Sequence, residues 1–499
     1  MPPVSQAVLL SWSVPPAASF ALAVTAVVYL RGWVRLRRAG VPFVPLWRAV
    51  CFLLGLLTLW VALASPCDTF SAFVLTAHML QHMLLMMVAP PLILLGAPLV
   101  PLVRGLPAFA AREFAGPFLN WRVAKQVGNA LIHPAVALLL LGGALFAWHT
   151  PRLYELALAS GSWHEVEHAC FFAASLIFWW PVIQPWPSRP RGPRWGMVPY
   201  LLAADVENTV MSAILVFSDR LLYPSYAAMP RLFGFSAVHD QAAAGALMWV
   251  MGSMAFTIPA MLIAVECLQG KRGRRQISLP GRRVTWLRVR WPIAFTRRFP
   301  PGRWNSQPRE ALSFLLLFAV TGLYLAHLAA APSDDDDQAL RFRGQSGAFA
   351  VSVFAPSGDL ETGASDFSVL VQDANSQGVL RDATVDLYAQ EVAGPQRTGP
   401  VRATSEDAEN KLLQSASLNL PAEGEWKVSI VVRRGAQRAD FSLPVRVVRP
   451  EGGKSLPWPY LVLLGFSVVL WLTYYSRNRA ARTPGFAQAL PGKSTAHVP

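Results

Sequence analysis

Long apolar runs constrain the fold of this chain more strongly than any other feature of its sequence. A helix of about 20 apolar residues crosses the ~30 Å hydrocarbon core of a bilayer, and about nine such runs follow one another along the 499 residues. The composition, with 53% hydrophobic and 15% charged residues, fits the same class. The sequence therefore predicts an all-α polytopic membrane bundle of about nine transmembrane helices. The expected spans are 18–34, 47–65, 70–92, 131–149, 165–184, 198–217, 240–266, 310–331 and 457–475.

Lys and Arg are distributed unevenly between these runs, and their pattern predicts the orientation of the chain. Alternate connecting segments hold 28 of them, whereas the short segments on the opposite side hold only Arg152, Arg220 and Arg231. Because cytoplasmic loops are enriched in Lys and Arg, we expect an extracytoplasmic N-terminus and a cytoplasmic C-terminus. Topology and contact with anionic membrane lipid then explain the net charge of +15, and no nucleic-acid partner is expected.

One stretch, residues 340–449, has the character of a soluble domain. Short segments of alternating apolar residues, separated by turn residues, predict a β-sandwich of about seven strands. The topology makes this domain extracytoplasmic, and it has no His, Met or Cys with which to bind a soft metal. The expected order is a seven-helix membrane bundle at 1–268, a basic cytoplasmic loop at 269–309, a transmembrane helix at 310–331, a linker and Ig-like β-sandwich at 332–456, a transmembrane helix at 457–475 and a cytoplasmic tail at 476–499.

Histidines gather at one predicted depth of the bundle. Two pairs have a spacing of four residues, which places both members of a pair on one face of a helix. Imidazole suits copper, zinc and haem iron, and polar groups within a bilayer are costly and mark functional sites. We predict a metal site near the outer face, with hydrogen-bonded polar packing as the alternative. The candidate ligands are His78, His82, His149, His164, His168 and His239.

Several further residues could support such a site. Met86 continues the helical stripe of the first histidine pair, and a thioether beside imidazole favours Cu(I), although core packing also explains it. Asp205, Glu207 and Asn208 lie within a predicted span, where they could relay protons or bond neighbouring helices. Asp240 could orient the adjacent imidazole of His239.

Four motifs carry a family resemblance. HMLQHMLLMMVAPPLILLGAP (78–98), FAWHTPRLYELAL (146–158), WHEVEHACFF (163–172) and HDQAAAGALMW (239–249) resemble the multi-span CtaG family, the membrane assembly factors of caa-type cytochrome c oxidases. The β-rich segment is similar to the small extracytoplasmic domains of the YtkA/FixH-like group. The resemblance implies a role in building a haem–copper oxidase, at the copper-insertion stage, in a bacterial plasma membrane.

The functional hypothesis combines these points. We expect an assembly factor that binds copper at its outer-face histidines and helps to metallate the oxidase, with an oxidase subunit or a copper chaperone as partner. No nucleophile–base pair, phosphate loop or nucleotide motif is visible, so we do not expect an enzyme. The alternatives are a b-type haem protein and a copper or proton transporter that uses Asp205 and Glu207.

Overall fold

The computed structural model describes residues 4–107, 111, 121–188, 192–272, 338–356 and 358–449. Within these residues, six helices are long and apolar enough to cross a membrane, and a bent pair makes a seventh if it forms one span. They coincide with the first seven predicted runs. The runs at 310–331 and 457–475, and nearly all of the basic loop at 269–309, lie outside the described residues, so the number of nine stays a prediction.

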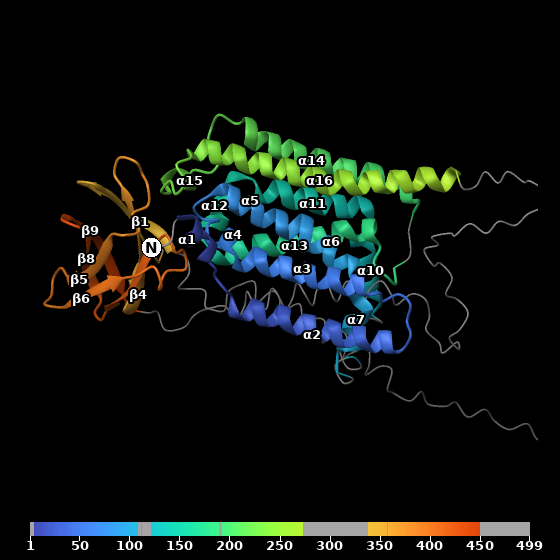
Figure 1. Cartoon of the computed structure of the whole chain (residues 1–499), viewed down its shortest axis with the longest axis horizontal. Coiled ribbons are helices and arrows are strands. Elements are labelled where there is room, and N and C mark those ends of the chain that lie inside the picture. Colours follow the sequence, from blue (N-terminus) through green and yellow to red (C-terminus); the bar gives the residue numbers. More distant parts are fainter. Residues whose placement is uncertain are drawn as a thin grey trace, which may run out of the picture. The chain divides into compact units, whose positions relative to one another are not determined.

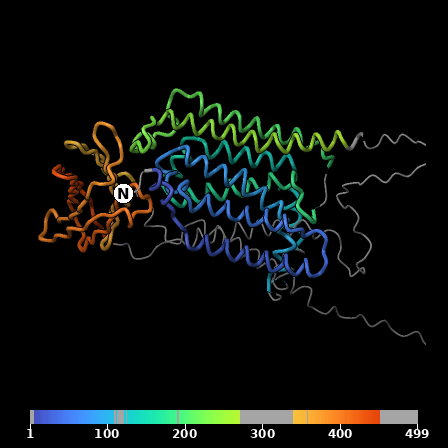
Figure 2. Tube along the Cα trace, in the orientation of Figure 1, coloured from blue at the N-terminus to red at the C-terminus, as the bar shows by residue number. Residues whose placement is uncertain are grey.

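The long helices lie side by side in the helical part of the chain, with shorter helices at their ends (Figures 1 and 2). Proline opens several of them, because it has no N–H to leave unpaired in a first turn. The helices are α1 (Val4–Leu10), α2 (Pro16–Arg38), α3 (Leu46–Ala64), α4 (Pro66–Thr69), α5 (Leu75–Met83), α6 (Ala89–Leu95), α7 (Leu99–Gly105), α10 (Arg122–Leu131), α11 (Pro134–Trp148), α12 (Pro151–Ala159), α13 (Gly161–Ile183), α14 (Met197–Phe217), α15 (Ser225–Ala228) and α16 (Ala237–Arg272).

A π-helical turn, η1 (Leu84–Val88), joins α5 to α6 within one span. Pro90 follows this turn and has no N–H with which to close an ordinary helical bond to the carbonyl of Met86. The indole N–H of Trp179 on α13 donates to that carbonyl instead, at 3.1 Å. Turns of this kind are frequent at functional sites, and this one begins at Leu84, two residues after His82.

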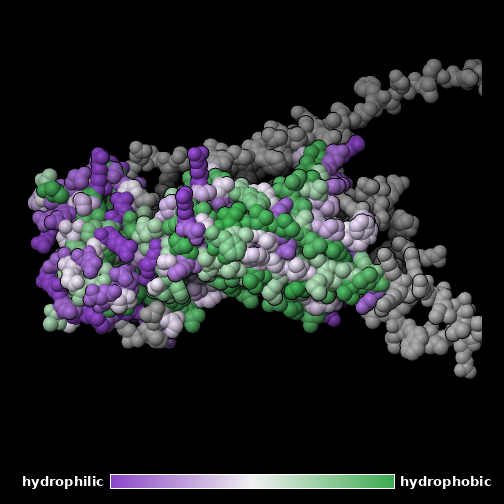
Figure 3. All heavy atoms as spheres, turned by 90° about the horizontal axis from the view of Figure 1, so that it is seen from above, coloured by the Kyte–Doolittle hydropathy of each residue, from purple (hydrophilic) through white to green (hydrophobic). Residues whose placement is uncertain are grey.

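Helix α13 is the most deeply buried span. Of its most apolar window, 78% is buried inside the protein, compared with 17% for α2. The outward faces of the other long helices carry large apolar side chains, such as Leu139, Phe217 and Met261, and hydrophobic residues cover much of the visible surface of the helical part (Figure 3). A bundle that is apolar both inside and outside is suited to a lipid environment.

The C-terminal described part is a β-rich domain, as the alternating segments predicted. One sheet has the strand order β1-β2-β4-β7 and the other has the order β3-β9-β8-β5-β6. Their buried side chains form one apolar cluster that includes Trp426, whose indole N–H donates to the carbonyl of Ala422 at 2.9 Å. The strands are β1 (Gln338–Ser346), β2 (Phe349–Pro356), β3 (Leu360–Glu361), β4 (Gly363–Asp373), β5 (Thr384–Glu391), β6 (Arg397–Ala403), β7 (Gln414–Leu420), β8 (Gly424–Arg434) and β9 (Gln437–Val448).

The expected number of about seven strands was too low. The alternating segments correspond to β2, β4, β5, β8 and β9, whereas β1 and β6 are edge strands. An edge strand buries less of its surface, and β6 shows only one buried residue, Ala403, at its end. Its sequence therefore lacks the alternation by which a strand is recognised.

Candidate metal centre

Helices α5 and α13 bring the two histidine pairs together. Within each pair the helical spacing keeps the rings close, with centroids 4.3 Å apart for His78 and His82 and 4.2 Å apart for His164 and His168. Between the helices, the rings of His78 and His164 lie 5.1 Å apart, and those of His82 and His168 lie 5.4 Å apart. The predicted convergence of the two pairs on one place is therefore confirmed.

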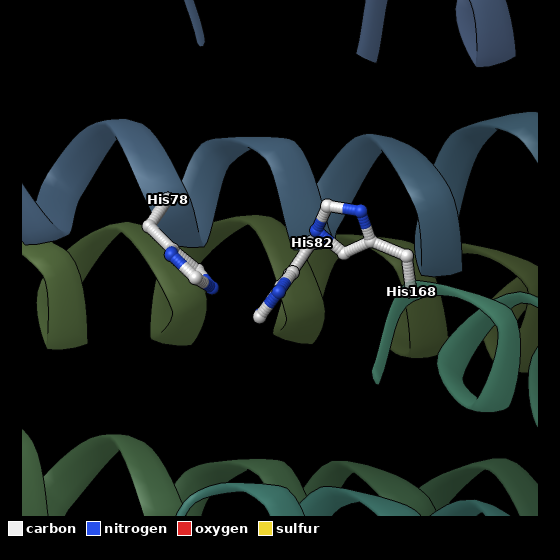
Figure 4. A group of neighbouring side chains, drawn as sticks. All are labelled: His78, His82 and His168. Carbon is white, nitrogen blue, oxygen red and sulfur yellow. The ribbon is translucent and has the colours of Figure 1, made fainter. Parts of the chain in front are cut away.

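Two overlapping sets of side chains have the geometry of a metal site. Ligand atoms of His78, His82 and His168 all lie within 4.8 Å of one another, and Figure 4 shows these three side chains reaching into the space between their helices. Ligand atoms of His78, His164 and Glu167 form a second set under the same limit. Because His78 belongs to both, the two sets are neighbours rather than separate sites.

Glu167 is the site residue that the sequence reasoning missed. Its carboxylate oxygens lie 3.7 Å from Nε2 of His78 and 3.8 Å from Nε2 of His82, and all three side chains are fully buried or nearly so. A signal was present in the sequence, since Glu167 lies three residues after His164 and next to His168 and so shares their side of the helix. The motif therefore supplies two imidazoles and a carboxylate from a single turn.

Nine polar atoms of this cluster are buried without hydrogen-bond partners among the described residues. Leaving a buried polar atom unpaired costs about 1–3 kcal/mol, so a concentration of such atoms calls for an explanation. Imidazole nitrogens and a carboxylate are ligands of transition metals, and a bound ion would satisfy several of them at once. The unpaired atoms are both ring nitrogens of His78 and His82, Nε2 of His149, His164 and His168, and both carboxylate oxygens of Glu167.

His149 lies at the edge of the cluster rather than within either set. It is the residue that ends α11, and its Nδ1 lies 2.8 Å from the carbonyl of Leu145, which leaves Nε2 free for another partner. Its ring is 6.3 Å from that of His82, and Phe171 contacts both rings, with centroid distances of 4.7 Å to His82 and 5.9 Å to His149. His149 thus lines the site from a third helix.

Three tyrosines border the cluster on another side. The ring of Tyr154 lies 5.2 Å from that of His78, and its hydroxyl lies 3.0 Å from that of Tyr226. Tyr226 donates to the carbonyl of Ser71 at 2.8 Å, so Tyr154 must be the donor of the bond between the two hydroxyls. Burial raises the pKa of Tyr226 well above its ordinary value, so it stays protonated and can donate. Tyr223 donates to the carbonyl of His149 at 3.0 Å.

The structure does not bring His239 into the cluster. Its side chain is exposed at the start of α16, and its backbone N–H donates to Ser236 Oγ at 3.2 Å. Asp240 does not serve the expected role of orienting His239 either. Its carboxylate accepts from the backbone N–H groups of Leu75 and Thr76, at 2.7 and 3.2 Å, and from Thr76 Oγ1 at 2.6 Å. It therefore caps the N-terminus of the helix that carries His78 and His82.

The polar residues of α14 belong to helix packing. Asp205 accepts a hydrogen bond of 2.7 Å from Ser253, and Asn208 donates to the carbonyl of Met248 at 3.3 Å, both on α16. Two glycines allow the close approach: a Cβ at Gly252 would lie 2.4 Å from Asn208, and one at Gly142 would lie 2.5 Å from Glu207. None of these three polar residues belongs to either metal-binding set among the described residues.

Met86 lies in the apolar core next to the cluster. It is 1% exposed and belongs to the hydrophobic cluster that fills the helical part. Its carbonyl accepts the Trp179 hydrogen bond at the π-helical turn. The core-packing alternative accounts for this position without a metal.

Comparison with known proteins gives three relatives of this chain. An uncharacterised protein of Mycobacterium leprae is 26% identical over 243 residues, which covers 48% of this chain and 36% of the relative. Uncharacterised proteins of Mycobacterium bovis and Mycobacterium tuberculosis are each 24% identical over 280 residues, covering 56% of this chain and 42% of the relative. The chain thus spans less than half the length of these relatives. No solved structure matches it.

A family model matches the part of the chain that carries the histidine cluster. The match covers residues 27–270, from the middle of α2 to the last turn of α16, and so includes all six predicted histidine ligands. The model describes the cytochrome c oxidase caa3 assembly factors, which confirms the resemblance carried by the four histidine motifs. Residues 27–270 of the chain thus match the cytochrome c oxidase caa3 assembly factor family.

Proposed function

We propose that this protein binds copper at the histidine cluster and helps to deliver it to a subunit of the oxidase during assembly. The observation that carries the proposal is the set of buried and unpaired ring nitrogens contributed by α5 and α13. Polar packing would leave few such atoms, because buried polar groups normally find partners. Copper binds well to imidazole, and it is a metal that a haem–copper oxidase must receive.

The cluster lies at one end of the long helices, which fits such a delivery role. His78 and His164 are near the beginnings of α5 and α13, and His149 is at the end of α11, so all three belong to the same end. The charge distribution of the loops predicts that this end faces the outside of the plasma membrane. An ion held there would lie beneath the outer surface, on the side from which a partner protein or copper chaperone would approach.

Copper fits the arrangement better than haem does. The ring centroids of neighbouring histidines in the cluster lie only 4.2–6.3 Å apart, so several rings surround the same small space. Axial haem ligands must instead stand on opposite faces of a flat macrocycle. A small ion needs only nitrogens about 2 Å from its centre. The proposed role is therefore that of a metal-binding assembly factor rather than a cytochrome or a catalyst.

The experiment is metal analysis of the full chain, purified in detergent and loaded with copper. We expect bound copper in the wild type, its loss in the His78→Ala/His82→Ala double variant, and its retention in His133→Ala. His133 is the matched control because it is an exposed histidine at the opposite end of α11. In cells, the double variant should insert normally yet lower oxidase activity while the oxidase polypeptides remain. Full copper binding or full oxidase activity in the double variant would overturn the proposal. A Soret band in the absorption spectrum of the purified protein would indicate that the site binds haem instead of copper.

A further inference from the structure

The two metal-binding sets share His78 but do not merge into one. The first set is made of three imidazoles, and the second contains His164 and Glu167 in place of His82 and His168. The five side chains offer more ligands than a single tetrahedral ion can take, since such an ion binds four. Their number and spread indicate more than one position for a metal.

The carboxylate of Glu167 lies between these positions. Its two oxygens face different histidines of α5, with Oε2 next to His78 and Oε1 next to His82. The separations of 3.7 and 3.8 Å are too long for hydrogen bonds. They are close to the separation of about 3.3 Å between two ligands of one tetrahedral ion whose bonds are about 2 Å long. Each oxygen is thus placed to share an ion with a different histidine.

We propose that the cluster binds two copper ions bridged by Glu167, an inference that rests on the proposed function. The first ion is held by His78, His164 and Oε2 of Glu167. The second is held by His82, His168 and Oε1. Two ions bridged in this way lie about 3.5–4 Å apart.

Charge supports a bridging carboxylate at this place. Two cations at such a distance repel each other strongly in a site from which water is excluded. Glu167 is 0% exposed, and no Lys or Arg is paired with it among the described residues. Its negative charge is therefore available to both ions. The harder oxygen ligand also favours the divalent state of copper more than an all-histidine site does.

The test counts copper in the full chain after loading with Cu(II) and removal of excess metal. The wild type should hold two ions per chain. Glu167→Gln keeps the size of the side chain but removes its charge. This variant should hold one ion, bound by His78, His82 and His168. His164→Ala should also hold one ion, and the His78→Ala/His82→Ala double variant should hold none. Glu165→Gln is the matched control, because Glu165 lies on the same helix but in neither set, and it should hold two ions.

Electron paramagnetic resonance gives an independent readout. Two bridged Cu(II) ions couple magnetically, so the wild type should show much less signal than its copper content implies. Glu167→Gln should show the full signal of one isolated ion. A single ion in the wild type, or two ions in both the wild type and Glu167→Gln, would overturn the two-ion site while leaving the proposed function intact. A wild type that binds no copper would instead refute the proposed function itself.

Discussion

Removal of the Asp240 carboxylate tests whether a distant residue controls the metal centre through the position of α5. The side chain comes from α16 and accepts three hydrogen bonds from the first turn of α5, at 2.7, 3.2 and 2.6 Å. In Asp240→Ala, the N–H groups of Leu75 and Thr76 lose this acceptor. His78 and His82 lie only one and two turns further along the same helix. Loosening of the first turn should therefore disturb both ligands.

The size of the effect follows from the bonds that are lost. Loss of an N-terminal cap costs about 0.5–2 kcal/mol. If α5 must be ordered again when copper binds, that cost appears in the affinity, where 1.4 kcal/mol corresponds to a factor of about ten. We expect Asp240→Ala to weaken copper binding about 3–30-fold. Asp240→Asn retains one acceptor oxygen and should have a smaller effect.

The assay is a competition titration of the full chain in detergent against a copper chelator of known affinity. Asp219→Asn provides the control, because Asp219 is an exposed carboxylate in the segment between α14 and α15. The reasoning predicts the order wild type and Asp219→Asn, then Asp240→Asn, then Asp240→Ala, from tightest to weakest. An affinity of Asp240→Ala within twofold of the wild type would refute the coupling between the cap and the site.

Three further predictions concern other parts of the chain. Trp179→Phe removes the donor to the Met86 carbonyl and should lower the free energy of unfolding by about 1–3 kcal/mol, measured by thermal unfolding in detergent; an unchanged midpoint would mean that the π-helical turn does not need this bond. Trp426→Ala should destabilise the β-rich domain by about 3–5 kcal/mol, because the side chain is 0% exposed, and limited proteolysis of the full chain should then cleave that domain first. Phosphatase fused at about residue 340 should be active and a fluorescent protein dark, because the loop charges place this segment outside; the opposite pattern would reverse the topology.

The sequence could predict the meeting of the histidine pairs because helical spacing is a local property. Residues four apart lie on one face of a helix whatever that helix contacts. Predicting a shared face for each histidine pair, His78 with His82 and His164 with His168, therefore required only that the two helices be recognised. Their depth followed from the rise of 1.5 Å per residue. Glu167 was also within reach of this reasoning, because it shares the face of the second pair.

Other features of the site depend on contacts between distant segments. Asp240 lies next to His239, but its partners, Leu75 and Thr76, are about 165 positions away in the chain. No local pattern indicates that α16 would present Asp240 to α5 and leave His239 exposed. The strands of the β-rich domain show the same limit, since the alternating segments were recognised and the edge strands β1 and β6 were not.

The contrast between α14 and the histidine cluster separates the rival functions. A transporter that uses Asp205 and Glu207 requires these carboxylates to face a path for ions or protons. Asp205 is instead bonded to Ser253, and Glu207 packs against Gly142, where a Cβ would collide with it. These side chains lie where interhelical packing places polar groups. The ring nitrogens of His78 and His82 have no such partners in the described part of the chain. Because an unpaired polar atom is costly inside a membrane protein, the need for a ligand is concentrated at the histidines, and a binding role there explains both regions with one site.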